Sequence, residues 1–364
     1  MALISDSRAE ALNTFLAKAG WGDAARMPLG QDASTRRYTR LLRNDRAVAM
    51  LMDAPPIEPP VCPPDADAAT RAALGWNAMT RLAASRVDAF VLIAGHLRGL
   101  GLSAPDILAH DSDAGFALLE DFGKDREFAR LIERGAADET ELYVAAAETL
   151  AKLHDAPVPD IIGAGGERWP LLTFDAVALR ANADLYADWL PQHGGGAALS
   201  GEMRTRWETA RDGLVAQAEA FPRVFTLRDY HAENLLWLED GRIGLLDFQD
   251  AVKGWDAWDL AMLTQDARRH VSEAAAETAI TRYLDLTGKS REAFDERLAI
   301  IGALNALRIA GVFARLMIRD GKPRYGDFLP RQMALLARNL EHPATADMRA
   351  FVKEATPFVF EESL

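Results

Sequence analysis

Three side chains in one short stretch have the types and spacing that phosphoryl transfer requires. Asp229 and Asn234 stand in a D-x-x-x-x-N arrangement, and Asp247 follows the apolar run Ile243–Leu246. A kinase-type reaction uses one carboxylate beside the attacking hydroxyl, and one amide and one carboxylate on magnesium. The three residues therefore indicate an ATP-dependent small-molecule kinase.

A predicted hairpin brings these residues together. The apolar runs Leu235–Leu238 and Ile243–Leu246 flank a D-G pair, which is a strong turn signal. Such a hairpin would place Asp247 at its exit and close to Asp229. The alternative is that Asp229 and Asn234 are ordinary turn residues, because Asp and Asn favour turns. A strand-turn-strand that ends in L-L-D-F is much rarer, so we favour the functional interpretation.

Composition narrows the classes of partner. The chain has 364 residues, 49% of them hydrophobic, and a net charge of −13, which argues against a nucleic-acid binder because such proteins need a basic face. The single cysteine, Cys62, rules out an intrachain disulfide and fits a reducing cytosol. Asp6 and Glu10 lie where a signal peptide would be apolar, and no apolar run approaches a membrane span. We expect a cytoplasmic protein with no membrane partner; its oligomeric state stays open.

The hydrophobic pattern predicts an α+β fold with a small β-rich amino-terminal part and a larger, mostly helical remainder. The amino-terminal part is expected to hold helices over Arg8–Ala19 and Val87–Leu100, strands over Gln31–Leu42, Ala47–Asp53, Pro105–His110 and Phe116–Leu119, and an irregular proline-rich loop over Ala54–Pro64. Further helices are expected over Glu141–His154, Ala274–Leu286, Phe294–Asp320 and Gln332–Leu340.

The segments LRDYHAENLLW and GLLDFQDAVKGWDAWDLAML resemble the aminoglycoside phosphotransferase and choline kinase group, which has the bilobal protein-kinase-like fold. LLED, LAKLHDAP and GQDASTRRYTRL extend the resemblance over most of residues 30–265. The resemblance implies a nucleotide-covering lobe over residues 1–119 and a catalytic, acceptor-binding lobe over residues 120–364.

The same resemblance implies individual roles, with ATP and Mg²⁺ as the cofactors. Asp229 would be the catalytic base, and Asn234 and Asp247 would be the magnesium ligands. Asp259 matches a family aspartate that is usually structural, and we expect it to cap a helix. The hinge that receives adenine through backbone groups would include Leu119, Glu120 and Asp121.

A finer resemblance concerns the acceptor. DASTRRYTRL, MDAPP, LRDYHAENLLW and FARLMIRDGKPRY are most similar to kinases of cell-wall sugar recycling, which phosphorylate the anomeric hydroxyl of N-acetylmuramate and N-acetylglucosamine. This implies a small amino sugar as the acceptor. In this fold carboxyl-terminal helices build the acceptor pocket, so Arg308 or Arg315 could meet a lactyl carboxylate. The alternative is that both arginines are solvated or paired with acids.

The sequence departs from the kinase pattern on the nucleotide side. Kinases carry a lysine on the third strand paired with a helix glutamate, but this chain has no lysine between Lys18 and Lys124. An arginine can bind phosphate instead, and the candidates lie on the amino-terminal hairpin. We favour Arg37, because it lies with Ser34 in the expected nucleotide-covering loop. The other candidates are Arg36, Arg40, Arg43 and Arg46, and the alternative is a solvated basic edge strand.

Residues next to the expected base leave alternatives open. His231 stands two residues after Asp229, where protein kinases have a lysine near the transferred phosphoryl group. It could donate to the same oxygens or form a hydrogen bond within the loop. Arg228 could pair with Asp250 or with a substrate carboxylate, and the sequence does not decide between them.

Two rival functions remain at this point. The first is an aminoglycoside, choline or homoserine kinase, for which Trp255, Asp256 and Trp258 could form a cage around a cationic acceptor. The second is a nucleotide-binding pseudokinase, which is favoured by the missing lysine and by the absence of any glutamate between Glu58 and Glu120. Retention of the expected base and of both expected magnesium ligands opposes the second reading.

Overall fold

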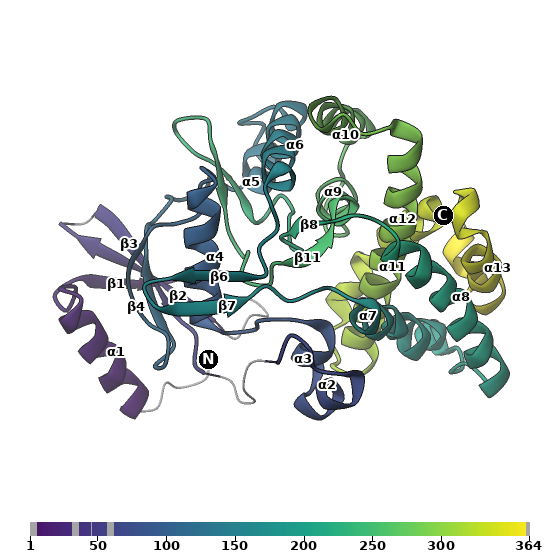
Figure 1. Ribbon diagram of the computed structural model, residues 1–364, viewed down its shortest axis with the longest axis horizontal. Coiled ribbons are helices and arrows are strands. Elements are labelled where there is room, and N and C mark those ends of the chain that lie inside the picture. Colours follow the sequence, from purple (N-terminus) through teal and green to yellow (C-terminus); the bar gives the residue numbers. More distant parts are fainter. Residues whose placement is uncertain (1–5, 31–35, 45, 57–61, 362–364) are drawn as a thin grey trace.

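The computed structural model describes residues 6–30, 36–44, 46–56 and 62–361. A β-sheet lies at one end of the molecule, and helices fill most of the remainder (Figure 1). This arrangement confirms the predicted α+β class.

The amino-terminal sheet is antiparallel, with the strand order β1-β2-β3-β5-β4. Its strands are β1 (Ala25–Pro28), β2 (Arg37–Arg43), β3 (Arg46–Asp53), β4 (Ile107–Asp111) and β5 (Phe116–Leu119). Four of them fall on predicted strands, whereas β1 was not predicted. The predicted strand over Gln31–Leu42 is confirmed from Arg37 onward, and its residues 31–35 lie outside the described part of the chain.

One helix covers each face of this sheet, as Figure 1 shows for α1 (Asp6–Lys18) and α4 (Val87–Gly99). Side chains alternate between the two faces of a strand. Leu118 accordingly packs with the apolar side of α1, whereas Leu119 joins the larger core that contains α4. The predicted helices are therefore confirmed, because their apolar residues are the ones that bury the two faces.

The chain between β3 and α4 crosses from the sheet to the helical part. It contains α2 (Ala68–Leu74) and α3 (Trp76–Thr80), and α3 packs against α7 (Ala176–Trp189). We call residues 62–86 the crossing segment. The sequence predicted only a proline-rich loop here, and residues 57–61 of that loop lie outside the described part of the chain.

The carboxyl-terminal part is mostly helical. Its remaining helices are α5 (Phe128–Glu133), α6 (Glu139–Asp155), α8 (Gly201–Glu219), α9 (Asp256–Thr264), α10 (Glu273–Thr287), α11 (Arg291–Ile318), α12 (Leu329–Asn339) and α13 (Ala346–Ala355). Its strands form short pairs: β6 (Ile161–Ala164) with β7 (Glu167–Pro170), β8 (Arg223–Thr226) with β11 (Val252–Trp255), and β9 (Leu235–Trp237) with β10 (Ile243–Leu245). The predicted helices match α6, α10, α11 and α12, whereas α5, α7, α8 and α13 were not predicted and α9 was implied only by the expected cap at Asp259.

Helix α11 is the central helix of this part and packs against α7, α9 and α12. A Cβ atom on Gly311 would lie 2.2 Å from the backbone carbon of Leu185 in α7, so glycine permits the close approach of the two helices. Among the described helices, α11 alone has the length and hydropathy of a membrane span. Because 67% of its apolar window is buried inside the protein, packing accounts for that composition.

Candidate active site

The loop between β8 and β9 carries the expected base and one expected magnesium ligand. The Asn234 side chain donates from Nδ2 to the backbone oxygen of Asp229 at 2.9 Å. This bond fixes the amide orientation and leaves Oδ1 free to accept or to bind a metal. The Asp229 carboxylate is partly exposed and accepts no hydrogen bond from the residues that the structure describes. Both side chains are therefore positioned for contact with a ligand.

The predicted hairpin is present and aligns Asp247 with this loop. Strands β9 and β10 pair in antiparallel register, with Leu245 opposite Leu235. Beyond β10, the N–H of Leu246 donates to the backbone oxygen of Asn234 at 3.0 Å. Asp247 follows at once with a φ of 55°, a left-handed conformation that non-glycine residues seldom adopt. Such strain is stored mainly at functional sites.

Asn234 and Asp247 fit a magnesium ion that also binds nucleotide phosphates. Mg²⁺ prefers oxygen ligands and usually takes only one or two from the protein. The pair offers an amide oxygen and a carboxylate on adjacent backbone positions. Within the described residues there is no cluster of three or more His, Cys, Asp or Glu that would suit a fully protein-bound metal.

The loop between β8 and β9, residues 227–234, carries the expected base, and we call it the catalytic loop. It is held by the carboxylate of Asp259, which is completely buried. It accepts the N–H groups of Leu227 at 2.7 Å and Arg228 at 2.8 Å. Arg228 has a φ of 77°, so these two bonds stabilise a strained residue directly before Asp229. The prediction that Asp259 caps a helix is wrong, because the N-cap of α9 is Trp255.

Arg228 and Asp250 are engaged within the protein. The Arg228 guanidinium is 4% exposed, donates from Nη1 to the backbone oxygens of Thr80 at 3.0 Å and Arg81 at 3.1 Å, and lies over the ring of Phe174. Burial lowers its pKa, against the charges of nearby carboxylates. Arg228 forms no hydrogen bond to Asp250, although the Asp250 carboxylate is the largest charge that acts on it. Contact of Arg228 with a substrate carboxylate stays a prediction.

The carboxylate of Asp250 is bound by backbone instead. Its Oδ1 accepts the N–H groups of Ala83 at 2.5 Å and Ala84 at 3.3 Å, in the crossing segment just before α4. Burial raises the pKa of Asp250; the charge of Arg228 opposes this rise, and Asp229 adds to it. These contacts show that the Asp250 carboxylate anchors the crossing segment, and its role in acceptor binding stays a prediction.

His231 is packed within the catalytic loop. It is 8% exposed, and its Nε2 lies 3.3 Å from Nδ2 of Asn234. Its Nδ1 is buried without a hydrogen-bond partner in the described part of the chain. This geometry agrees with the alternative in which His231 forms a hydrogen bond within the loop. A contact between His231 and the transferred phosphoryl group stays a prediction.

The arginines expected on the nucleotide side have different partners. Arg36 donates from Nη2 to Oδ1 of Asp247 at 2.5 Å and from Nη1 to Gln249. Arg37, the favoured candidate, lies 4.0 Å from the Asp53 carboxylate of β3 instead. Arg40 pairs with Asp121. The structure therefore brings Arg36, not Arg37, to the expected magnesium ligand. Ser34 lies outside the described residues.

The predicted adenine hinge begins where expected, at Leu119 on the end of β5. The N–H of Glu120 donates to the backbone oxygen of Asp106 at 2.8 Å, so it is occupied by sheet pairing. The Asp121 carboxylate binds Arg40 and the N–H of Gly123. The Glu120 N–H is therefore not available to adenine. Binding of adenine by other backbone groups of the hinge stays a prediction.

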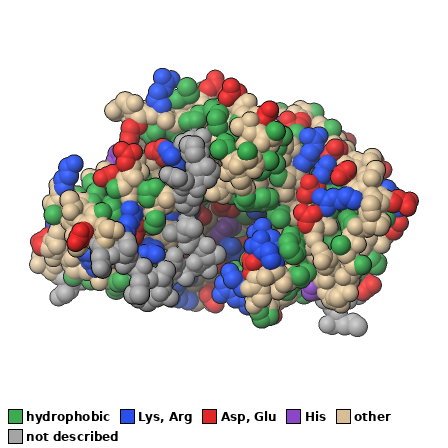
Figure 2. Space-filling view, turned by 90° about the horizontal axis from the view of Figure 1, so that it is seen from below, with side chains coloured by type: hydrophobic (Ala, Val, Ile, Leu, Met, Phe, Trp, Pro, Cys, Tyr) green, Lys and Arg blue, Asp and Glu red, His purple; other side chains and the backbone are tan. Residues whose placement is uncertain are grey.

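Two arginine side chains, Arg308 and Arg268, lie close enough to Asp229 for their charges to act on its carboxylate. Arg308 of α11 donates from Nε and Nη2 to Oδ1 of Asn305 and forms no ion pair within the described residues. Burial lowers the pKa of Arg308 to about 10, and the charge of Asp229 opposes this change. Arg268 lies within range of the same carboxylate and pairs with Glu233 at 2.8 Å. Figure 2 shows a hollow in the molecule with acidic and histidine side chains inside and basic side chains beside it.

Arg315 lies two turns beyond Arg308 on α11, where its Cζ is 6.0 Å from the ring centroid of Trp76 in α3. Asp229 is among the charges that act on Arg308 but not among those that act on Arg315. The predicted cage for a cationic acceptor is not formed. Trp255, Asp256 and Trp258 are each at most 1% exposed, and Asp256 pairs with Lys289.

Comparisons with known proteins place the chain among phosphotransferases. The model of the phosphotransferase enzyme family matches residues 26–295. The chain is 46% identical to a protein of Caulobacter vibrioides named N-acetylmuramate/N-acetylglucosamine kinase, over 97% of this chain and 98% of that one. It is 33% identical to a Pseudomonas aeruginosa protein of the same name, over 90% of each chain.

Solved structures share the fold at low identity. A choline kinase from Streptococcus pneumoniae matches with a TM-score of 0.57 and 14% identity, over 92% of this chain and 100% of that one. An aminoglycoside phosphotransferase with bound ADP matches with a TM-score of 0.55 and 12% identity, over 92% and 99%. The predicted kinase-like fold is confirmed. The chain belongs to the phosphotransferase enzyme family, and it is an ATP-dependent kinase.

Proposed function

We propose that this kinase transfers the γ-phosphoryl group of ATP to the anomeric hydroxyl of N-acetylmuramate or N-acetylglucosamine. The observation that carries the proposal is the loop before β9, where the Asn234 side chain binds the backbone of Asp229 and a backbone hydrogen bond brings Asp247 next to Asn234. The Asp229 carboxylate accepts no hydrogen bond from the described residues. Two relatives at 46% and 33% identity carry the name of a kinase for these sugars, which supports the choice of acceptor.

In the proposed reaction Asp229 accepts the proton of the acceptor hydroxyl while the oxygen of that hydroxyl forms a bond to the γ-phosphorus. The bond between that phosphorus and the bridging oxygen breaks, and ADP leaves. Mg²⁺, held by Asn234 and Asp247, would neutralise charge on the phosphates. The anomeric hydroxyl is the most acidic hydroxyl of such a sugar, which makes it a favourable partner for a carboxylate base.

The charges around Asp229 support an uncharged or anionic acceptor over a cationic one. Arg308 and Arg268 lie within electrostatic range of Asp229, and Arg308 forms no ion pair within the described residues. A cationic acceptor such as choline would need an aromatic or acidic cage, and the three residues predicted for that cage are buried. We assign Arg308 to acceptor binding close to the reacting hydroxyl.

The proposal includes a cytoplasmic location, since both substrates of such a reaction are expected where ATP is made. The single cysteine, buried and unpaired in the structure, is compatible with a reducing compartment.

The test is a panel of acceptors assayed with ATP and Mg²⁺ by the formation of ADP. We expect turnover with the two N-acetylated amino sugars and sharp rejection of glucose, because a site built for an acetamido group leaves polar atoms unpaired without it. Preference for choline, homoserine or an aminoglycoside would favour the first rival function. Binding of ATP without turnover of any acceptor would favour a pseudokinase.

A further inference from the structure

Helix α3 leads from the catalytic loop toward the surface. The backbone oxygen of Thr80, at its carboxyl end, accepts a hydrogen bond from Nη1 of Arg228 at 3.0 Å, and Arg228 directly precedes the base. Trp76 begins the helix one turn earlier, and the residue is 42% exposed. An exposed indole thus lies about 6 Å along the helix axis from a residue that contacts the catalytic loop.

Helix α11 leads outward from the same place. Arg308 lies within electrostatic range of Asp229, whereas Arg315 lies next to the ring of Trp76. Seven residues make about two turns, so the two arginines share one face of the helix and stand about 10 Å apart along its axis. One end of α3 therefore contacts the Arg228 side chain, α11 carries Arg308 close enough for its charge to act on Asp229, and the two helices meet at Trp76 and Arg315.

Arg315 is a half-buried cation whose charge is not balanced by an ion pair in the described residues. Its Nε is buried and has no hydrogen-bond partner there. Burial lowers its pKa, as does the positive charge of Arg319, while Asp320 has the opposite effect. A carboxylate bound through the other nitrogens of the guanidinium would balance this charge, and the exposed indole of Trp76 suits the apolar face of a sugar ring.

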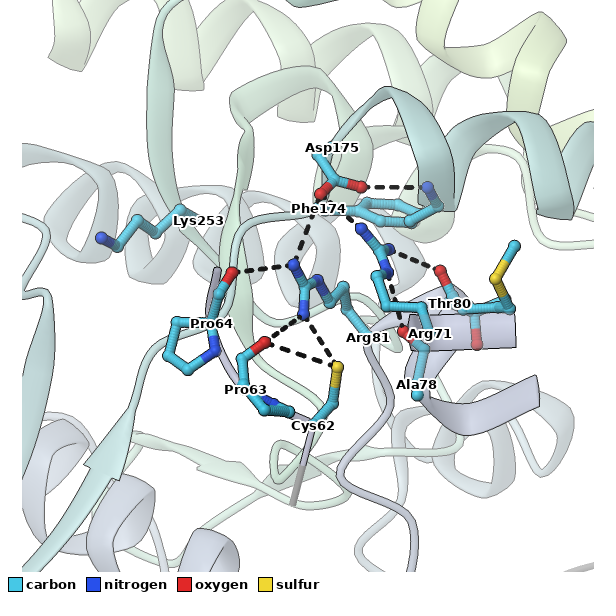
Figure 3. Close-up of polar contacts among 12 residues, drawn as sticks. Cys62, Pro63, Pro64, Arg71, Ala78, Thr80, Arg81, Phe174, Asp175 and Lys253 are labelled. Atoms are coloured by element: carbon cyan, nitrogen blue, oxygen red, sulfur yellow. Dashed lines mark hydrogen bonds and ion pairs between the residues drawn. The ribbon is translucent and has the colours of Figure 1, made fainter. Parts of the chain in front are cut away.

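The crossing segment holds Trp76 in place. The buried Arg71 donates from Nε to the backbone oxygen of Ala78 at 3.1 Å and from Nη2 to that of Met79 at 2.6 Å, both in α3. Its Nη1 donates to Oδ2 of Asp175, the N-cap of α7, at 2.6 Å. Figure 3 shows Arg71 and Arg81 converging on Asp175 between the crossing segment and α7. These bonds fix α3 relative to the helical part before any ligand binds, which reduces the entropic cost of binding.

We propose that Trp76 and Arg315 form an outer acceptor subsite that binds a carboxylate carried by a substituent on the amino-sugar ring. The proposal rests on the proposed function, and it separates the roles of two arginines. Arg308 would serve any sugar whose anomeric hydroxyl lies at Asp229, whereas Arg315 would serve only an acceptor with an anionic substituent. On N-acetylmuramate the carboxylate could be the lactyl group, and on a muramyl peptide it could be a peptide carboxylate.

The test measures kcat/KM for N-acetylmuramate and for N-acetylglucosamine, which lacks the carboxylate. Arg315→Gln should lower the ratio of the first value to the second about tenfold, in line with the loss of a hydrogen bond to a charged group. The ratio for Arg315→Lys should lie between those of Arg315→Gln and the natural protein, because lysine keeps the charge but not the planar fork. Trp76→Ala should change the ratio in the same direction as Arg315→Gln.

Arg319→Gln is the matched control, because Arg319 lies one turn beyond Arg315, is exposed and pairs with Asp320. It should leave the ratio unchanged. Two further acceptors identify the carboxylate: N-acetylmuramate with its lactyl group blocked as the amide, and a muramyl peptide. Loss of the Arg315 effect with both would assign the lactyl group, and its survival with the peptide alone would assign a peptide carboxylate.

The two proposals fail differently. If the natural protein phosphorylates neither sugar, the proposed function is wrong and the outer subsite falls with it. If it phosphorylates both, but Arg315→Gln and Trp76→Ala leave the ratio within twofold of the natural protein while remaining folded by circular dichroism, only the outer subsite is wrong.

Discussion

The residues assigned to chemistry are held mainly through their backbone neighbours. Asp259 binds the N–H groups of Leu227 and Arg228, and Asn234 binds the backbone oxygen of Asp229. Two residues beside the site, Arg228 and Asp247, have positive φ angles. Such conformations cost about 1–3 kcal/mol each and persist only when neighbouring bonds enforce them. The loop is therefore fixed before substrates arrive, which is how a phosphoryl-transfer site gains most of its rate.

The first prediction concerns Asp229. Asp229→Asn keeps the shape of the side chain but removes its capacity to accept a proton, so kcat should fall by about 10²–10⁴-fold. Affinity for ATP, measured by equilibrium titration, should stay within about twofold. Asp240→Asn is the control, since Asp240 lies on the exposed turn of the hairpin. Full activity in Asp229→Asn would rule out its role as the base.

The second prediction concerns the magnesium ligands. Asp247→Ala removes a charged ligand and should abolish turnover across the whole range of a magnesium titration. Asn234→Ala removes a neutral ligand, so it should shift the magnesium optimum upward and keep measurable turnover at high concentration. The same order is expected for magnesium-dependent nucleotide binding. A natural metal optimum in Asp247→Ala would place the metal on other residues.

The third prediction concerns the cation that replaces the missing strand lysine. Arg36→Ala should raise KM for ATP and lower kcat together, because Arg36 is the arginine that reaches Asp247. Arg37→Ala is the matched control on the neighbouring residue and should have the smaller effect on both. Arg36→Lys should rescue only in part, since a point charge lacks the planar fork. Equal kinetics for the two alanine variants would remove Arg36 from phosphate binding.

At the scale of elements, local sequence patterns were enough to predict contacts between segments that are close in sequence. The D-G turn and its apolar flanks predicted the hairpin of β9 and β10, and with it the approach of Asp247 to Asn234. Contacts between distant segments have no such signal. The bond from Arg36 to Asp247 spans 211 positions, so only the folded sheet identifies Arg36 over Arg37. Helix α8 was missed although its buried residues recur at helical spacing, because one of them is Arg211 and polar residues make up much of the rest of the helix.

The fourth prediction concerns the anchor of the crossing segment on α7. Burial alone would raise the pKa of Asp175, but hydrogen bonds from Arg71 and Ala178 and the charges of Arg71 and Arg81 hold it below the ordinary value. Asp175→Asn leaves two buried guanidinium groups without their carboxylate. It should lower the free energy of unfolding by about 2 kcal/mol at pH 7, less than for a fully buried pair.

The pH dependence of that loss follows from the direction of the shift. Because the folded pKa of Asp175 lies below its unfolded pKa, the stabilising contribution is complete above the unfolded value near 4 and disappears as pH falls through the folded value. Denaturant titrations of both proteins at pH 7 and in acid should show the difference shrinking with acidity. Asp188→Asn, on the same helix but exposed, is the control. A difference that does not depend on pH would show that the ion pairs are not its source.

At the scale of the whole molecule, the amino-terminal part and the helical part both contribute residues to the candidate site. The amino-terminal part contributes Arg36, directly before β2, and the predicted hinge after β5, whereas the helical part contributes the catalytic loop, the hairpin and α11. The crossing segment adds backbone contacts to Arg228 and Asp250, so the amino-terminal half also helps to hold the residues around Asp229. The predicted boundary near residue 119 marks the end of the sheet, but it does not separate the residues of the site.

The most direct test of the proposed chemistry asks which hydroxyl receives the phosphoryl group. N-acetylglucosamine, its methyl glycoside and its 6-O-methyl ether are incubated with the natural protein, ATP and Mg²⁺, and the products are followed by phosphorus NMR. We predict that the methyl glycoside is inert, because its anomeric hydroxyl is blocked, whereas the 6-O-methyl ether gives a sugar 1-phosphate. Phosphorylation of the methyl glycoside, or a 6-phosphate from the free sugar, would contradict transfer to the anomeric position.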